Sequence, residues 1–300
     1  LVLALAACGN NGDNSAATEE AAVSESTGAA DFPVTVGDTT LDAEPQRIIS
    51  MSATATEMLY AIGAGSQVVA VDEYSNYPAE AVALGTPLSG FEPNIEAISG
   101  YTPDLVIISY DPGSLVEQLS TLDIPVFVAG AAMSIENVYE QIEQLGVLTG
   151  NSQKAIEVSK TLQTGIEEAV ASVQFSEPPL SYYYELDNTY YSVTSNTFIG
   201  QIFNLFGMRN IADNVESGND YPQLSAEVIV SADPDFIFLA DTKCCAQDAT
   251  TVAARDGWGG LKAVTANQVV ELDDDVASRW GPRVLELITA IRDAVVAANS

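Results

Sequence analysis

One sequence pattern occurs twice in this chain, at a constant spacing of 131 residues. Asn94-Ile95-Glu96-Ala97-Ile98 precedes Pro103-Asp104-Leu105-Val106-Ile107, and Ser225-Ala226-Glu227-Val228-Ile229 precedes Pro234-Asp235-Phe236-Ile237-Phe238. Each copy is typical of a helix N-cap, a glutamate in the first helical turn, a short helix, a Pro-Asp turn and a buried strand. The repeat predicts two similar lobes with a pseudo-symmetric cleft between them.

Apolar runs of strand length alternate with helical patterns on both sides of residue 150, which predicts parallel sheets with helices on both faces. We therefore expect an α/β fold with two Rossmann-like lobes. The expected strands are Arg47–Met51, Val68–Val71, Leu105–Ile108, Pro125–Val128, Leu180–Leu186, Tyr190–Val193, Phe236–Leu239 and Val269–Leu272. The expected helices are 56–62, 113–122, 135–148, 197–206, 225–232 and a last helix from about Arg283.

The longest uninterrupted helical pattern runs from Ser152 to Gln174, and Pro178-Pro179 closes this region. A helix of that length spans about 34 Å, which is more than one small domain requires. We expect it to bridge the lobes. The predicted organisation is an N-terminal lobe over 32–150, a bridging helix over 151–177 and a C-terminal lobe over 178–300.

The first residues indicate where the protein is located. Leu1 to Ala7 are apolar but too few to span a bilayer, and they are typical of the clipped end of a signal peptide in 1–8. Leu5-Ala6-Ala7-Cys8 resembles a bacterial lipobox, which implies that Cys8 carries a lipid. Residues 9–31 are small and polar and predict a flexible tether. The expected location is extracytoplasmic, with a lipid anchor in the bacterial cell membrane.

Charge and composition exclude several classes of function. The formal net charge of −32 opposes binding to nucleic acid and to anionic lipid headgroups, so the anchor is the only membrane contact that we expect. The sequence has no histidine, which removes Ser-His-Asp and Cys-His catalysis and the commonest zinc ligand. It also lacks a Gly-x-Gly-x-x-Gly motif after a strand and a Gly-Lys-Ser/Thr phosphate loop. We predict neither an enzyme nor a cofactor.

The order and spacing of several segments resemble the helical-backbone (class III) substrate-binding proteins of ABC importers, including the cobalamin and ferric-siderophore receptors. The similarity extends from about Arg47 to the C-terminus. The segments that carry it are Arg47–Ser52, Thr56-Glu57, Val71–Pro78, Pro103–Ile107, Tyr221–Glu227 and Arg279–Arg283.

This resemblance implies capture of a corrinoid or a ferric chelate, followed by docking on a dimeric ABC permease. It implies that Glu96 and Glu227 are the docking acids, one on each lobe, and such receptors are usually monomers. A simpler interpretation is that each glutamate complements its helix dipole, which contributes about 0.3–1 kcal/mol.

Ligands of such proteins bind on the loops at the carboxyl ends of the strands. Aromatic side chains with polar tips suit a flat macrocycle, and we expect about half of those on these loops to reach the ligand. The candidate ligand-binding residues are Tyr74, Tyr77, Phe91, Tyr110, Tyr190, Tyr221, Asp275, Arg279 and Trp280. Cobalamin binders often carry a tryptophan where this chain has Phe91, so either Phe91 substitutes for it or the ligand differs.

The charges favour a neutral or weakly charged ligand. No Lys or Arg occurs between Arg47 and Lys154, so an anionic catecholate would depend on Lys243, Arg255, Arg279 and Arg283 alone. A corrinoid or a ferric hydroxamate fits better. Haem remains an alternative, as does a hard cation held by carboxylates such as Asp273-Asp274-Asp275. A surface sensor without transport is the other alternative.

Adjacent cysteines at 244 and 245 are the least expected feature. Neighbouring Cα atoms are about 3.8 Å apart, below the usual span of a disulfide. Three states stay open for Cys244 and Cys245: a strained vicinal disulfide at the cleft mouth, two free thiols, or a redox or soft-metal role.

Overall fold

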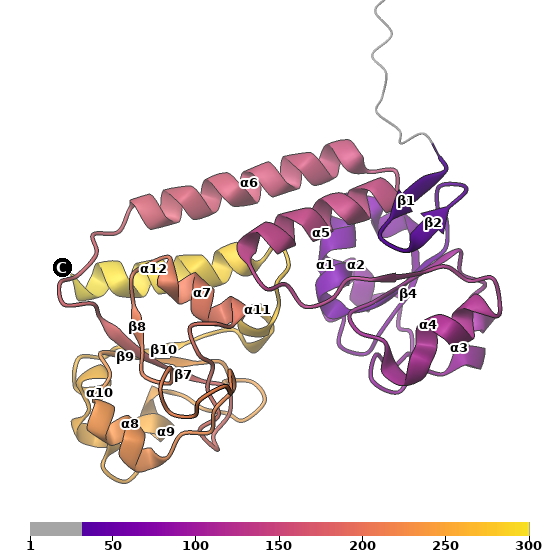
Figure 1. Cartoon of the computed structure of the whole chain (residues 1–300). Coiled ribbons are helices and arrows are strands. Elements are labelled where there is room, and N and C mark those ends of the chain that lie inside the picture. Colours follow the sequence, from indigo (N-terminus) through magenta and orange to yellow (C-terminus); the bar gives the residue numbers. More distant parts are fainter. Residues whose placement is uncertain (1–31, 300) are drawn as a thin grey trace, which may run out of the picture.

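The computed structural model describes residues 32–299. Two lobes, each built on a four-stranded sheet, lie side by side beneath the long helix α6 (Figure 1). Cys8 and the expected tether lie outside the described residues. Within the described part of the chain, no helix combines the length and the apolar character that crossing a membrane requires.

The N-terminal sheet has the strand order β4-β3-β5-β6, and all its neighbouring pairs are parallel. A short antiparallel hairpin of β1 and β2 precedes it. The strands are β1 (Val34–Val36), β2 (Thr39–Leu41), β3 (Ile48–Met51), β4 (Val68–Val71), β5 (Leu105–Ile108) and β6 (Val126–Val128). The helices of this half are α1 (Ala53–Ala61), α2 (Ala79–Val82), α3 (Ile95–Gly100), α4 (Leu115–Ser120) and α5 (Ile135–Leu148), with short 3-10 turns η1 (Ala64–Gln67) and η2 (Pro112–Ser114).

The C-terminal sheet has the order β10-β9-β7-β8 and is also parallel throughout. Its strands are β7 (Ser181–Glu185), β8 (Arg209–Asn210), β9 (Phe236–Leu239) and β10 (Val269–Glu271). The helices are α7 (Phe198–Asn204), α8 (Ala226–Ala232), α9 (Ala249–Ala253), α10 (Lys262–Thr265), α11 (Asp274–Ser278) and α12 (Val284–Ala298), with the 3-10 turn η3 (Trp258–Gly260). Numbered within each lobe, both sheets have the strand order 2-1-3-4, so the lobes share one topology.

The sequence repeat has the same structure in both lobes. Asn94 and Ser225 cap α3 and α8 by accepting hydrogen bonds from backbone N–H groups three residues later. Asp104 accepts from the backbone N–H groups of Gln46 and Arg47 before β3, at 2.8 and 2.9 Å. Asp235 accepts from the N–H and hydroxyl of Ser181, the first residue of β7, at 2.8 and 2.7 Å. Each Pro-Asp turn therefore ties one central strand to the start of the other.

Side chains alternate between two apolar cores along each central strand, as a parallel strand covered on both faces requires. Leu105 and Ile107 face one core of the N-terminal lobe, whereas Val106 and Ile108 face the other. Tyr182 and Tyr184 likewise point away from Tyr183. The first core is shared by both lobes, because α1, α5, α6, α7 and α12 all contribute to it.

Helix α6 (Ser152–Ala171) packs against α5 of the N-terminal lobe and α12 of the C-terminal lobe. Figure 1 shows it extending above both lobes. Its 20 residues span about 30 Å. The helix ends earlier than the expected residue 174, because Ser172 is the C-cap and its hydroxyl bonds back to the Ala169 carbonyl.

The α/β prediction with two lobes is confirmed, and most strands lie where they were expected. The expected strand Tyr190–Val193 is wrong: only Tyr191 forms an isolated antiparallel bridge, to Gln223. The hairpin of β1 and β2 and the two-residue strand β8 were not predicted.

Candidate functional site

Three exposed aromatic side chains from the N-terminal lobe form one group. Tyr74, Phe91 and Tyr110 are 51%, 61% and 43% exposed. The ring centroids of Tyr74 and Phe91 are 5.2 Å apart, edge to face, and those of Phe91 and Tyr110 are 6.1 Å apart. We call these residues the aromatic triad. Large rings exposed together on a soluble protein are typical of a binding surface.

The loops that carry Tyr74 and Phe91 are tied together beyond the carboxyl end of β4. Asp72 pairs with Leu88 in an isolated parallel bridge, and the Glu73 N–H donates to the Leu88 carbonyl at 2.9 Å. The Asp72 carboxylate is buried and accepts from the Ser75 hydroxyl at 2.6 Å, and burial raises its pKa. A Cβ at Gly90 would lie 2.7 Å from that carboxylate and 3.2 Å from the Met51 carbonyl oxygen, so a larger residue there would have to displace the Asp72 side chain. The triad therefore rests on a fixed loop pair.

On the C-terminal lobe, Tyr221 is 55% exposed on a loop that is bonded to the chain after β7. The Ser192 N–H donates to the Pro222 carbonyl and the Leu224 N–H to the Tyr190 carbonyl, both at 3.0 Å. Tyr191 is also exposed, although sequence reasoning did not select it. The selected neighbour Tyr190 instead stacks on the fully buried Trp258, at 5.6 Å between centroids.

A network of polar bonds joins the two lobes beside the triad. Arg279 donates to Glu57 at 2.8 Å, to the Tyr74 carbonyl at 3.0 Å and to Asp275 at 2.7 Å. Asp275 also accepts from Asn76 of the N-terminal lobe at 3.1 Å and from Lys243 at 2.7 Å. Asp275 and Arg279, both selected as ligand residues, therefore bond to each other at the end of α11, and each also bonds across the lobe junction to the N-terminal lobe.

Glu57 is the buried end of this network, with only 1% of its side chain exposed. Burial raises its pKa, while Arg279 and then Arg283 favour the ionised form. Its Oε1 atom accepts from both guanidinium groups, and its buried Oε2 atom has no hydrogen-bond partner among the described residues. Sequence reasoning did not select Glu57 as a functional residue, although an acid on an apolar helix face is a detectable signal.

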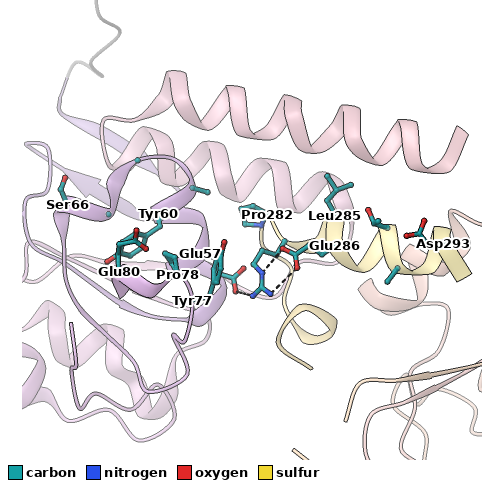
Figure 2. Close-up of a pocket in the computed structure, with 16 residues that line it drawn as sticks. Glu57, Tyr60, Ser66, Tyr77, Pro78, Glu80, Pro282, Leu285, Glu286 and Asp293 are labelled. Carbon is teal, nitrogen blue, oxygen red and sulfur yellow. Dashed lines mark hydrogen bonds and ion pairs between the residues drawn. The ribbon is translucent and has the colours of Figure 1, made fainter. Parts of the chain in front are cut away.

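Tyr77 and Trp280 do not join the aromatic triad. The Arg283 guanidinium lies 4.4 Å above the Tyr77 ring, and Tyr77 lines a separate cavity of about 1240 Å³ between α1 and α12. Figure 2 shows Tyr77 in this cavity beside Glu57 and Pro78. Trp280 is half-buried, packs on the shared core and donates its indole N–H to Gln141 of α5 at 3.1 Å.

Two buried carboxylates lie at the carboxyl ends of the central strands β7 and β9. Glu185 accepts both ends of the Arg255 guanidinium, at 2.6 and 2.5 Å. Asp241 is fully buried, and neither of its carboxylate oxygens has a hydrogen-bond partner among the described residues. Burial, followed by the charge of Glu185, raises the pKa of Asp241 to about 7. Sequence reasoning did not select this group.

The acidic run and the cysteines lie on the C-terminal rim. Asp273 caps α11, while Asp274 accepts from the backbone N–H groups of Lys243 and Cys244. The carboxylates therefore hold the rim loop, and among residues 32–299 no group of three or more acidic or cysteine side chains is placed to hold a metal ion. Both cysteines are free thiols in the structure, with Cys244 exposed and Cys245 half-buried.

Glu96 and Glu227 occupy equivalent exposed positions in the first turns of α3 and α8. In Figure 1, α3 and α8 lie on the side of the molecule away from α6, one on each lobe. Neither glutamate forms an ion pair with another of the described residues.

The sequence is similar to one family and to several relatives. Residues 48–276 match the family described as periplasmic binding protein. The substrate-binding lipoprotein YvrC of an ABC transporter in Bacillus subtilis is 30% identical over 97% of this chain and 92% of its own length. A cobalamin-binding protein of Halobacterium salinarum is 32% identical over 89% of this chain and 75% of its own.

Solved structures show the same architecture. The vitamin B12-binding protein BtuF of Vibrio cholerae superposes with a TM-score of 0.69 and 27% identity, over 85% of this chain and 98% of that protein. A protein from Staphylococcus epidermidis described as a possible iron-binding (periplasmic solute-binding) protein superposes with a TM-score of 0.73 over 84% of this chain and 99% of its own, and its 23% identity supports the fold alone.

Proposed function

This chain belongs to the periplasmic binding proteins, the substrate-binding proteins of ABC transport, and from that premise we propose that it captures a corrinoid between its lobes. The aromatic triad of Tyr74, Phe91 and Tyr110 is the observation that carries the proposal. Three adjoining exposed rings provide a broad apolar surface for one face of a macrocycle, and Tyr221 offers a further ring from the other lobe. Relatives named as cobalamin-binding proteins support this choice.

The cations of the C-terminal lobe also favour an uncharged ligand. Four were candidates for neutralising an anionic chelate, and each is paired with carboxylates in the structure: Lys243 with Asp273 and Asp275, Arg255 with Glu185, Arg279 with Glu57 and Asp275, and Arg283 with Glu57 and Glu286. A ferric catecholate would have to break these pairs and leave buried carboxylates uncompensated, which is costly. A corrinoid could bind without breaking these ion pairs.

The proposal includes delivery to a membrane complex. The lipid on Cys8 holds the receptor at the outer face of the membrane, and Glu96 and Glu227 dock on basic residues of the two permease subunits. Support for docking comes from the equal chemistry and equal placement of the two glutamates on pseudo-equivalent helices. Isolated exposed acids contribute little to stability, which leaves these two available for a partner.

Calorimetry tests which of the candidate ligands the protein binds. The unlipidated chain, with Cys8→Ser, is titrated in turn with cyanocobalamin, a ferric hydroxamate, a ferric catecholate and haem. We expect tight one-to-one binding of cyanocobalamin and weak or no binding of the other three. Tight binding of an iron chelate or haem alone would overturn the corrinoid assignment while leaving the family unchanged. Corrinoid uptake by cells that lack this gene then separates a transport receptor from a surface sensor.

A further inference from the structure

The cavity between α1 and α12 is separate from the aromatic triad. One wall comes from α1, the turn after it and the Tyr77-Pro78 loop, and the other comes from the segment Pro282–Asp293 that includes most of α12 (Figure 2). None of Tyr74, Phe91 and Tyr110 lines it. The Glu57–Arg279 pair stands between the two places, because Glu57 lines the cavity while Arg279 bonds to the Tyr74 carbonyl. Its volume of about 1240 Å³ is ample for a small molecule.

Acceptor groups outnumber cations in this cavity. Four carboxylates, Glu57, Glu80, Glu286 and Asp293, line it against the single guanidinium of Arg283. That guanidinium is already shared by Glu57 at 3.4 Å and Glu286 at 3.2 Å, as the dashed lines in Figure 2 mark. The lining therefore has unused capacity for a donor that carries positive charge.

Tyr60 and Glu80 belong to the part of this lining that the N-terminal lobe provides. Burial, followed by the charge of Glu80, raises the pKa of the Tyr60 hydroxyl, and Figure 2 shows the two side chains next to each other in the lining. Glu80 makes no ion pair with any other residue that the structure describes. An aromatic ring beside a free carboxylate is the combination that attracts an organic ammonium group.

The apolar part of the lining suits an aliphatic chain. Ala61, Leu285 and Ala290 contribute carbon surface between the polar groups. The Tyr60 ring keeps its place because residue 65 is glycine: a Cβ there would lie 2.6 Å from the ring.

We propose that the cavity between α1 and α12 is a second binding site, which takes a small aliphatic ammonium ion with Tyr60 and Glu80 as its principal contacts. The carboxylates neutralise the ammonium group, the Tyr60 ring faces it, and the carbon chain covers Ala61 and Leu285. A bare metal ion fits less well, because no cluster of three ligating side chains occurs within residues 32–299.

The test uses 1,6-diaminohexane as the probe and 1,6-hexanediol as its uncharged analogue, titrated into the full chain at about 0.15 M salt. We expect the diamine to bind with one-to-one stoichiometry and the diol not to bind. Glu80→Gln should weaken diamine binding about tenfold, which corresponds to about 1.4 kcal/mol. Gly65→Ala should weaken it as well by displacing Tyr60, with folding checked by the thermal midpoint.

Because the chain carries a net charge of −32, a matched control must separate the site from diffuse counterion attraction. Glu117→Gln provides it, since Glu117 is also an exposed acid in the first turn of a short helix of the same lobe and forms no ion pair within residues 32–299. Unchanged binding by this variant supports the site. Equal weakening by both glutamine variants, binding of the diol, or no saturable diamine binding up to about 10 mM would each overturn the proposal.

Discussion

Glu57 and Arg279 are 222 residues apart in the sequence and form a buried ion pair across the lobe junction, with 2.8 Å between Oε1 and Nη1. Their side chains are 1% and 10% exposed. Because Arg279 also bonds to the Tyr74 carbonyl and to Asp275, the pair fixes the distance between the triad loop and the C-terminal rim. The Arg279 guanidinium therefore contributes to the width of the proposed cleft, together with the Asn76–Asp275 and Arg283–Glu57 contacts across the same junction.

Replacing Arg279 by alanine should destabilise the protein by about 3–5 kcal/mol, because the change leaves the buried Glu57 with only the longer Arg283 contact. Glu57→Gln should cost less, since the amide oxygen still accepts from Arg279. Chemical denaturation monitored by tryptophan fluorescence measures both. Lys154→Ala serves as the control: Lys154 pairs with Glu157 at the surface, and its loss should cost less than about 1 kcal/mol. Equal effects of R279A and K154A would contradict the assigned role.

The aromatic triad should contribute to corrinoid affinity ring by ring. Alanine at Tyr74, Phe91 or Tyr110 removes one ring contact of about 0.5–1.5 kcal/mol, so each change should raise Kd by about 2- to 13-fold in calorimetry. Phe91→Trp should preserve or strengthen binding, because it enlarges the stacking surface at the centre of the group. Tyr77→Ala is the matched control, since Tyr77 lines the other cavity. A Kd that responds to Y77A as strongly as to F91A would argue against the triad as the ligand surface.

Much of this fold is predictable from sequence because buried parallel strands are continuous apolar runs. The observed β4, β5 and β9 match the expected strands Val68–Val71, Leu105–Ile108 and Phe236–Leu239 residue for residue. The hairpin over 34–41 was missed, although Gly37-Asp38 between two threonine- and valine-rich segments is a hairpin signal. Its strands of three residues are too short to show periodicity, and the two-residue β8 has none at all.

The site was less predictable than the fold, because a sequence places an aromatic residue on a loop but does not orient its ring. Tyr74 and Tyr77 are on one loop, yet tertiary packing turns one toward Phe91 and the other beneath Arg283. Glu57 and Asp241 were missed for the related reason that burial and partners depend on the opposite lobe or strand. Local patterns carry no information about those contacts.

Charge reversal at Glu96 or Glu227, the proposed docking residues, should abolish transport without affecting ligand capture. Glu96→Lys or Glu227→Lys would replace the proposed attraction to a basic permease residue by repulsion, whereas neither glutamate is a member of the triad or lines the hollow beside Phe91. Corrinoid uptake in cells, measured beside calorimetry on the purified variants, separates the two effects. Glu117→Lys makes the same change of charge at another exposed first-turn acid and should leave uptake unchanged. Normal uptake with E96K and E227K combined would exclude these residues from docking.

Asp241 should make stability fall as pH rises toward neutrality. Its pKa is raised to about 7 in the folded protein, so the folded state keeps a proton that the unfolded chain loses near pH 4. Between these values the folded state binds more protons, and the free energy of unfolding declines until about pH 7. Asp241→Asn removes the titration, and its amide can donate to the neighbouring Glu185 carboxylate.

The expected result for Asp241→Asn is a higher thermal midpoint than the parent at pH 8, with a difference that shrinks toward pH 4, where the unfolded parent chain keeps the proton as well. The gain at pH 8 should reach a few kcal/mol, because each unit of pKa difference corresponds to about 1.4 kcal/mol. Asp248→Asn is the contrasting control: Asp248 caps α9, and its hydrogen bonds with Thr251 lower its pKa. That variant should lose stability at pH 8. A parallel response of both variants to pH would mean that Asp241 is ionised in the folded protein throughout this range.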